Sequence, residues 1–102
     1  MGKEPRLSTQ TIKVLGALLT GTTDELSGAE ISRRTSLASG TLYPILARLE
    51  DAGWLQSRWE AGRATDLGRP RRRYYRVTAE GSKNVQALVR DLTPAAGRLA
   101  WS

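Results

Sequence analysis

The chain has 102 residues, the usual size of a single domain with one core. It contains no Cys and no His, which excludes disulfide frameworks, thiolate or imidazole zinc sites and His-based acid–base catalysis. Sixteen Lys and Arg against ten Asp and Glu give a net charge of +6, and the isoelectric point near 10.5 makes nucleic acid a leading partner.

The remaining composition narrows the class of protein further. No apolar run approaches the roughly 18 residues needed to cross a bilayer, and cysteine-free composition suits a reducing compartment. We therefore expect a cytoplasmic protein without membrane association and without a cofactor. Apolar residues make up 39 % of the chain, below the globular average of about 45 to 50 %. Such a thin core would gain from burial against a second subunit.

The N-terminal half predicts a mobile arm followed by two helices. Residues 1–7 carry almost no apolar side chain and predict the arm. A first helix should begin at Ser8 or Thr9 and end at Gly21. Its apolar residues recur at helical spacing: Ile12, Leu15, Leu18 and Leu19. Ser27 followed by Glu30 forms a capping box, which predicts a short second helix through about Thr35.

A third helix gives the clearest periodic signal in the chain. Apolar residues fall at the i, i+3, i+4 and i+7 positions: Leu42, Ile45, Leu46 and Leu49. Gly53 is placed to end the helix. Pro44 lacks an N–H and clashes with the carbonyl four residues back, so the regular helix is expected to begin nearer Thr41 than Ser39.

Two alternating segments predict a β-hairpin. Leu55, Ser57 and Trp59 share one side of a strand over 54–60, and Tyr75 and Val77 face inward from a strand over 72–77. We assign Trp54 and Trp59 to the core. Residues 61–71 contain two glycines and a proline, which predicts a long, flexible, basic tip.

Thr78 is expected to cap a last helix that ends at Pro94. Its apolar stripe consists of Val85, Leu88, Val89 and Leu92. The same pattern would suit a helix packed on its own core. However, a helix at the edge of so small a domain has little intramolecular surface to cover, which favours dimerisation through this stripe. The expected organisation is an arm (1–7), a DNA-binding domain (8–78), a dimerisation helix (79–93) and a tail (94–102).

This order of elements predicts a mainly α fold with a small β-hairpin, the winged helix-turn-helix, plus a C-terminal dimerisation helix. In that fold the third helix enters the major groove. Small or hydrogen-bonding residues at its leading end lie opposite the apolar stripe. The candidates for DNA contact on this helix are Ser39, Thr41, Tyr43, Pro44 and Arg48.

The hairpin supplies a second set of DNA-binding candidates. Seven of the sixteen cations lie between residues 58 and 76, against only Glu60 and Asp66. A solvated loop kept soluble by charge is the alternative, but so dense a cluster favours contact with phosphates. The candidates in the hairpin are Arg63, Arg69, Arg71, Arg72 and Arg73.

Three stretches resemble the PadR family of bacterial and archaeal regulators: SGAEI at 27–31, SGTLYPILARLEDAGWL at 39–55 and GRPRRRYYRVTAEG at 68–81. The resemblance implies that Thr41 and Tyr43 touch DNA, that the arginine-rich hairpin is a wing on backbone or minor groove, and that the first and last helices build the dimer. With one C-terminal helix, the chain resembles the short subfamily. Ala29 stands where the family often has an aromatic residue.

The sequence therefore predicts a dimeric, sequence-specific DNA-binding transcriptional regulator and not an enzyme. The expected partners are a second copy of the chain and double-stranded DNA with a roughly palindromic operator. Repression is the simpler expectation, with release by an unidentified small-molecule effector, although no residue matches a defined ligand motif. The alternative is a winged-helix protein–protein interaction module that does not bind specific DNA.

Overall fold

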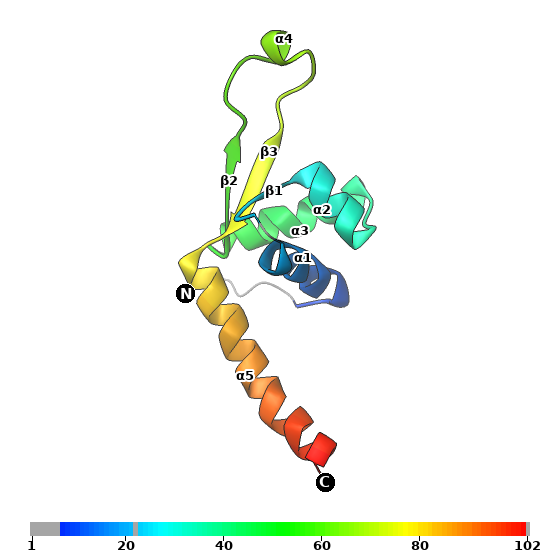
Figure 1. The fold of residues 1–102 in the computed structure, drawn as a ribbon, viewed down its shortest axis with the longest axis vertical. Helices are drawn as coiled ribbons and strands as arrows, with labels where there is room; N and C mark the ends of the chain where they lie inside the picture. Colours follow the sequence, from blue (N-terminus) through cyan, green and yellow to red (C-terminus); the bar gives the residue numbers. More distant parts are fainter. Residues whose placement is uncertain (1–6, 22, 102) are drawn as a thin grey trace.

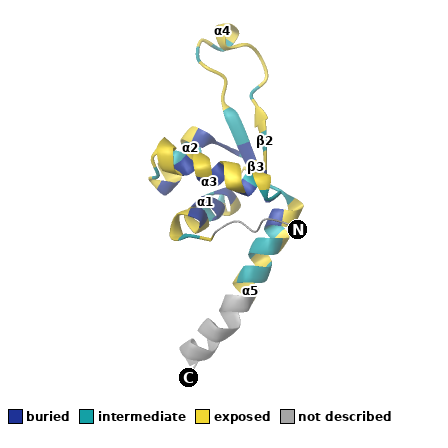
Figure 2. Cartoon of the chain, turned by 180° about the vertical axis from the view of Figure 1, so that it is seen from behind, coloured by how far each residue is buried: buried dark blue, intermediate teal, exposed yellow. Residues whose placement is uncertain are grey.

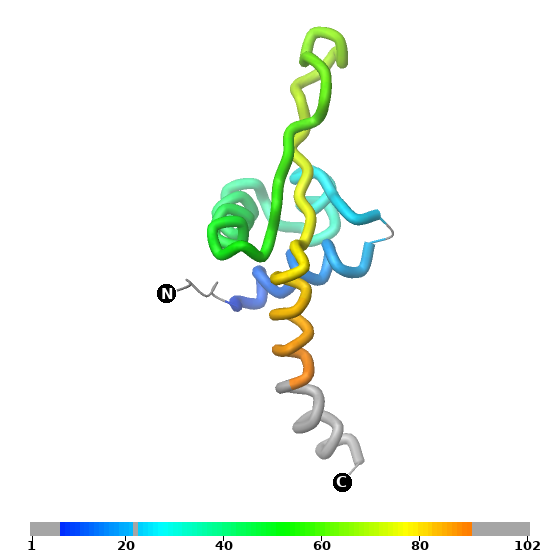
Figure 3. Tube along the Cα trace, turned by 90° about the vertical axis from the view of Figure 1, so that its left-hand side faces the viewer, coloured from blue at the N-terminus to red at the C-terminus, as the bar shows by residue number. Residues whose placement is uncertain are grey.

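The computed structural model describes residues 7–21 and 23–101, with side chains described as far as residue 90. Most of the expected arm, residues 1–6, lies outside this range. The elements follow in the order α1 (Thr9–Thr20), β1 (Leu26–Ser27), α2 (Gly28–Thr35), α3 (Ser39–Asp51), β2 (Leu55–Trp59), α4 (Ala64–Leu67), β3 (Arg73–Val77) and α5 (Ala79–Trp101). Three helices pack beside a small sheet, from which a hairpin and α5 extend in opposite directions (Figures 1 and 3).

The predicted fold class is confirmed, and so are the local signals that begin α1 and α2. Ser8 caps α1 by accepting a hydrogen bond from the Thr11 N–H. Ser27 and Glu30 form the complete capping box of α2. In α3 the whole predicted stripe is buried, and the helix is followed by Gly53 with φ of +82°, a conformation that glycine adopts without a steric penalty.

The predicted inner face of α1 is partly wrong. Ile12 is 57 % exposed and Leu19 is 43 % exposed. The buried face is instead Thr11, Val14, Leu15 and Leu18, which also has the i, i+3, i+4, i+7 spacing of an amphipathic helix. Thr11 can be buried because its hydroxyl is hydrogen-bonded to the Ser8 hydroxyl at 3.0 Å. A polar residue therefore occupies the inner face, and two large apolar residues are left on the surface.

The expected late start of α3 is also wrong, because the helix begins at Ser39 and continues through Pro44. Pro44 is exposed, as is Gly40 four residues before it. The helical hydrogen bond that proline cannot donate is thus missing on the side of the helix where water can replace it.

The sheet has three antiparallel strands in the order β1-β3-β2, one more than the predicted hairpin. In the missed strand, Leu26 pairs with Tyr75 and Ser27 with Tyr74. A two-residue strand is too short to show alternation, so no sequence pattern marks it. The hairpin itself is confirmed, with Leu55 opposite Val77 and Trp59 opposite Arg73.

Trp54 is buried as predicted, but the assignment of Trp59 to the core is wrong, because its side chain is 53 % exposed. The alternation predicts the facing correctly: Leu55, Ser57 and Trp59 do lie on one face of β2. The buried end of this face is at Leu55, and the strand continues to Trp59 beyond the helices that cover the core (Figure 2). The face of β2 that points toward the core is therefore longer than the helices that cover it, and Trp59 lies on the uncovered part.

The last helix, α5, is longer than predicted. It does not end at Pro94 but continues to Trp101. At its start, the Thr78 hydroxyl accepts a hydrogen bond from the Gly81 N–H and donates to the Gly53 carbonyl. The radius of gyration, 15.7 Å, exceeds the roughly 13 Å of a compact chain of this length, because α5 and the hairpin both project. No helix among the described residues could span a membrane.

Candidate nucleic-acid interface

One long face of α3 is open to solvent. The apolar side of this helix packs into the core. All five sequence-predicted residues of the other side are exposed: Ser39, Thr41, Tyr43, Pro44 and Arg48. The residue that precedes the helix is Ala38, which makes no side-chain cap. This face therefore presents one hydroxyl-rich end, one phenol and one guanidinium without an intervening acidic group.

Tyr43 is the α3 residue that faces the hairpin across a hollow. It is 45 % exposed, and its ring packs over Gly28 at the start of α2, so closely that a Cβ at position 28 would lie 2.5 Å from the Tyr43 hydroxyl oxygen. Tyr43 and Gly28 both line this hollow of about 500 Å³. The hollow is lined by α2, α3 and hairpin residues, among them Tyr43, Trp59, Arg71, Arg72, Arg73 and Tyr75. Tyr43 of α3 and the arginines of the cationic hairpin thus line the same hollow.

Sheet geometry explains why the hairpin arginines reach this hollow. Directly paired residues of an antiparallel ladder have side chains on the same face, and Arg73 is paired with Trp59 while Tyr75 is paired with Ser57. Tyr75 is 5 % exposed and faces the helices. Arg73 lies two residues away on the same strand, so it faces the same way but above the helices. Burial raises the pKa of Tyr75, which keeps its phenol neutral beneath the arginines.

Glu60 connects the two sides of the hairpin by hydrogen bonds. Its carboxylate accepts two hydrogen bonds from the Arg69 guanidinium, at 2.7 and 2.8 Å, and one from the Arg72 N–H at 3.1 Å. Its backbone carbonyl accepts a fourth from Arg71 Nε at 2.8 Å. The Arg69 hydrogen bonds and then the Arg72 N–H lower the pKa of Glu60 to about 2. The tip above it contains the short helix α4, where the sequence predicted only a flexible loop.

The five predicted hairpin arginines therefore differ in their surroundings. Arg69 is paired with Glu60 and Arg63 with Asp66. Arg73 lies 3.8 Å from Glu50 at the end of α3. Arg72 is exposed, and within the described part of the chain its side chain has no hydrogen bond or ion pair. The spacing of charges along the chain does not reveal this division.

The opposite face of the hairpin has its own polar contacts. Arg58 forms an ion pair with Glu25 and stacks over Tyr74, with 4.9 Å between its Cζ and the ring centroid. The hydrogen bond from Arg58 lowers the pKa of Glu25. Arg76 donates to Gln56 on the same face. These two arginines of the sequence cluster point away from the hollow beside Tyr43.

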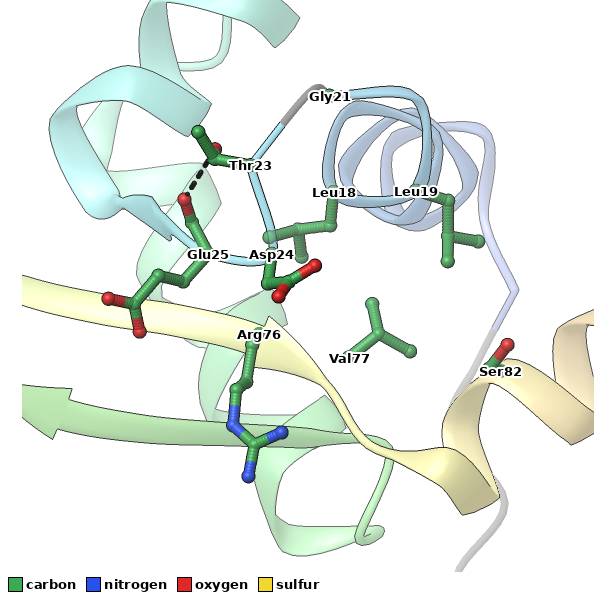
Figure 4. Close-up of a pocket in the computed structure, with 9 residues that line it drawn as sticks. All are labelled: Leu18, Leu19, Gly21, Thr23, Asp24, Glu25, Arg76, Val77 and Ser82. Atoms are coloured by element: carbon green, nitrogen blue, oxygen red, sulfur yellow. Dashed lines mark hydrogen bonds between the residues drawn. The ribbon is translucent and has the colours of Figure 1, made fainter.

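A second hollow, of about 810 Å³, lies where α5 leaves the domain. Figure 4 shows Leu18 and Leu19 of α1 on one side, Val77 and Ser82 on another, and Asp24, Glu25 and Arg76 at the charged side. Of the predicted dimerisation residues, Val85 and Leu88 are half-buried against the core, whereas Val89 is 54 % exposed. The side chain of Leu92 lies outside the described residues. The remaining apolar surface of α5 is thus close to the exposed Leu19.

The sequence does not indicate the roles of three residues in and near the hollow beside Tyr43. It treats Gly28 only as a residue of the second helix, Glu60 only as an opposing charge, and Trp59 as core. The position of Trp59 one residue before Glu60, in a strand that pairs with a run of arginines, is visible in the sequence. The length by which the hairpin exceeds the helices is not.

Comparison with known proteins agrees with this architecture. No curated protein matches the chain. A PadR-family transcriptional regulator from Eggerthella lenta is 28 % identical, with a TM-score of 0.59, covering 88 % of this chain and 81 % of that one. Bacillus subtilis PadR in complex with operator DNA is 21 % identical, with a TM-score of 0.64, covering 80 % of this chain and 48 % of that one.

A further solved structure concerns regulation of DNA binding of BpsR from Bordetella bronchiseptica by 6-hydroxynicotinic acid. It is 20 % identical, with a TM-score of 0.64, and the match covers 94 % of this chain but only 64 % of that one. The chain thus spans less than two thirds of the length of some of its structural relatives. The model of the transcriptional regulator PadR-like family matches residues 16–87. The expectation that the chain is no enzyme agrees with this match, and the protein belongs to the PadR-like family of transcriptional regulators.

Proposed function

We propose that this protein is a dimeric, sequence-specific DNA-binding regulator whose two α3 helices enter successive major grooves. The observation that carries the proposal is the shared hollow between Tyr43 of α3 and Arg71, Arg72 and Arg73 of the hairpin. A duplex that receives the exposed side of α3 in its major groove would meet these arginines on the adjacent backbone or minor groove. Bacillus subtilis PadR, which shares this fold and forms a complex with operator DNA, supports a DNA duplex as the partner.

The residues divide into two roles in this proposal. Thr41, Tyr43 and Arg48 contact base edges, because they are exposed along the α3 face and carry hydrogen-bonding groups. Ser39 at the helix start and Pro44 in the second turn lie against the sugar–phosphate backbone. The hairpin arginines supply sequence-independent attraction to phosphates, which depends strongly on salt. Of these, Arg72 has its whole side chain available, whereas Arg63 donates its Nε to Asp66 and Arg69 donates both terminal nitrogens to Glu60.

Dimerisation in this proposal uses α5 together with α1. Val89 and Leu19 are exposed, and both line one open hollow between α1 and α5. Ile12 adds a third exposed apolar side chain from α1. Covering these residues with the same surface of a second subunit would give a two-fold symmetric dimer. Two recognition helices related by that symmetry require a roughly palindromic operator.

The regulator is proposed to repress by occupying a promoter, and to be released by a small molecule. The hollow in Figure 4 contacts both the domain and the base of α5. A ligand there would change the angle at which α5 leaves the domain, and with it the spacing of the two recognition helices. Regulation of BpsR by 6-hydroxynicotinic acid is a precedent for aromatic acids as candidate effectors.

Footprinting on the DNA upstream of the protein's own gene tests the proposal. We expect a protected, roughly palindromic segment that is bound more tightly than random duplex of equal length, with affinity falling steeply as salt rises. Equal and weak binding to both duplexes would instead favour the protein–protein interaction module. The effector part is tested by titrating aromatic carboxylic acids against the bound operator, and failure of all of them to release it would overturn that part alone.

A further inference from the structure

Trp59 is an exposed tryptophan surrounded by arginines. Its indole lies on the hollow-facing side of the hairpin, and about half of its surface is open to solvent. The Arg73 guanidinium lies over its ring, with 4.9 Å between Cζ and the centroid, and that of Arg71 lies at 5.9 Å. Both distances fall within the roughly 6 Å range of cation–π attraction, for which tryptophan is the best aromatic partner.

The two stacked arginines are also held from their other sides. Arg73 lies 3.8 Å from Glu50 Oε2, and the Ser57 hydroxyl fixes that same oxygen by donating to it at 2.5 Å. Arg71 donates its Nε to the Glu60 carbonyl. These interactions leave terminal N–H groups of both guanidiniums available while restricting the rotamers that carry them. Both arginines line the hollow that faces Tyr43.

We propose that Trp59 is a positioning residue for DNA binding: its ring holds the Arg71 and Arg73 guanidiniums over the hollow beside Tyr43, where they meet the phosphate backbone. This inference rests on the proposed DNA-binding function. The physical reason is that a long, flexible side chain loses rotamer freedom when it binds, and an arginine already ordered by an aromatic face loses less. Trp59 thus raises affinity through its neighbours and not through its own charge, since it has none.

The hairpin offers a matched control for this idea. Tyr74 is stacked under Arg58 at the same distance, 4.9 Å, but on the opposite face, away from the hollow. Replacing each aromatic residue by leucine removes one cation–π platform from the same hairpin and leaves the net charge unchanged. Trp59→Leu and Tyr74→Leu therefore differ in which arginines they release.

The experiment measures operator affinity as a function of salt for the full chain and its variants, with thermal unfolding as a check of folding. We expect Trp59→Leu to weaken binding about tenfold, with a salt slope lower by about 0.9 for each phosphate that the arginines no longer reach. Trp59→Phe, which retains an aromatic face, should stay within about threefold of the parent protein, and Tyr74→Leu should bind as the parent does. Should Trp59→Leu not fold, Arg73→Lys serves instead, because it retains the charge but loses the planar stack, and it should also lower affinity and slope.

A double-mutant cycle separates positioning from direct contact. If Trp59 acts through Arg71 and Arg73, Trp59→Leu should add little to the effect of replacing both arginines by alanine. Fully additive effects would mean that Trp59 itself touches DNA, and an unchanged affinity and salt slope in Trp59→Leu would mean that it does nothing for binding; either result overturns the inference. If the parent protein does not bind DNA at all, the proposed function fails first, and the two failures are therefore distinguishable.

Discussion

The Tyr43 ring rests directly on Gly28, so that position 28 has no room for a side chain while Tyr43 keeps its place. Gly28 begins α2 and Tyr43 lies in the second turn of α3. The packing therefore fixes the phenol relative to both helices of the helix-turn-helix pair. It also gives a way to move Tyr43 without removing it.

Gly28→Ala is expected to displace the Tyr43 side chain, because the new Cβ would lie 2.5 Å from its hydroxyl oxygen. Removing one base-edge interaction should weaken operator binding by about fivefold to 150-fold. Thermal unfolding should change little, since the exposed phenol can rotate away. The control repeats the substitution in a Tyr43→Ala background, where no phenol remains to be displaced, so Gly28→Ala should cause no further loss of affinity there. An unchanged affinity of the Gly28→Ala single variant would show that the placement of Tyr43 is unimportant.

Arg72 and Arg48 should respond differently to truncation. Arg72→Ala should weaken operator and random DNA to the same degree and lower the salt slope by about 0.9, as expected when one phosphate is no longer neutralised. Arg48→Ala should relax the preference for particular bases at one operator position by about 1–3 kcal/mol. Binding to a set of single-base operator variants at several salt concentrations measures both. A loss of base preference in Arg72→Ala, with unchanged salt dependence, would reverse the two assignments.

The hydrogen bonds that Glu60 accepts across the hairpin predict that the stability of the hairpin depends on pH. The pKa of Glu60 in the folded protein is about 2, below its ordinary value of 4.5. Its stabilising contribution is therefore fully present above about pH 4.5 and is lost as the pH falls through the folded value. The Arg72 amide resonance should titrate with a midpoint near 2, provided that the domain stays folded, and should not titrate in Glu60→Gln. A midpoint near 4.5 would show that Arg69 and the Arg72 N–H do not hold the carboxylate in solution.

Val89 provides a test of the dimer. Val89→Asp places a charge in the surface proposed to be buried between subunits, and should raise the dimer dissociation constant at least about tenfold because an unpaired buried charge is costly. Sedimentation equilibrium measures this directly. Lys83→Asp introduces the same side chain at an exposed position on another side of α5 and should leave the association unchanged. If both variants dimerise as the parent does, another surface holds the subunits together.

Sequence periodicity was sufficient for the fold wherever an element is covered along its whole length. The stripe of α3 is an example, since all four of its apolar residues are buried. It was insufficient where the covering element ends early. Trp59 has the correct facing but lies past the helices, and Ile12 has helical spacing but belongs to the outer side of α1. Periodicity shows which residues share a face of a helix or strand, whereas the burial of that face depends on the element that packs against it.

For the candidate site, too, the sequence predicts some features and not others. The exposed side of α3 could be predicted because it is the complement of a buried stripe. The arginines of the hairpin could be identified as a cluster, but not sorted, because their roles depend on partners distant in sequence. Glu50 beside Arg73 and Glu60 beside Arg69 are pairs that join different elements or strands, and no local pattern in the chain specifies them.

The hydrogen bonds at Glu60 determine where the length of the hairpin can change. Because Arg69 and the Arg72 N–H are tied to one carboxylate, the residues from Ala61 to Gly68 form a loop whose two ends are fixed independently of what lies between them. Lengthening a loop with fixed ends is entropically inexpensive. The length of the hairpin can therefore be increased or decreased by insertion or deletion above Glu60, without altering the helical body that is proposed to read the bases.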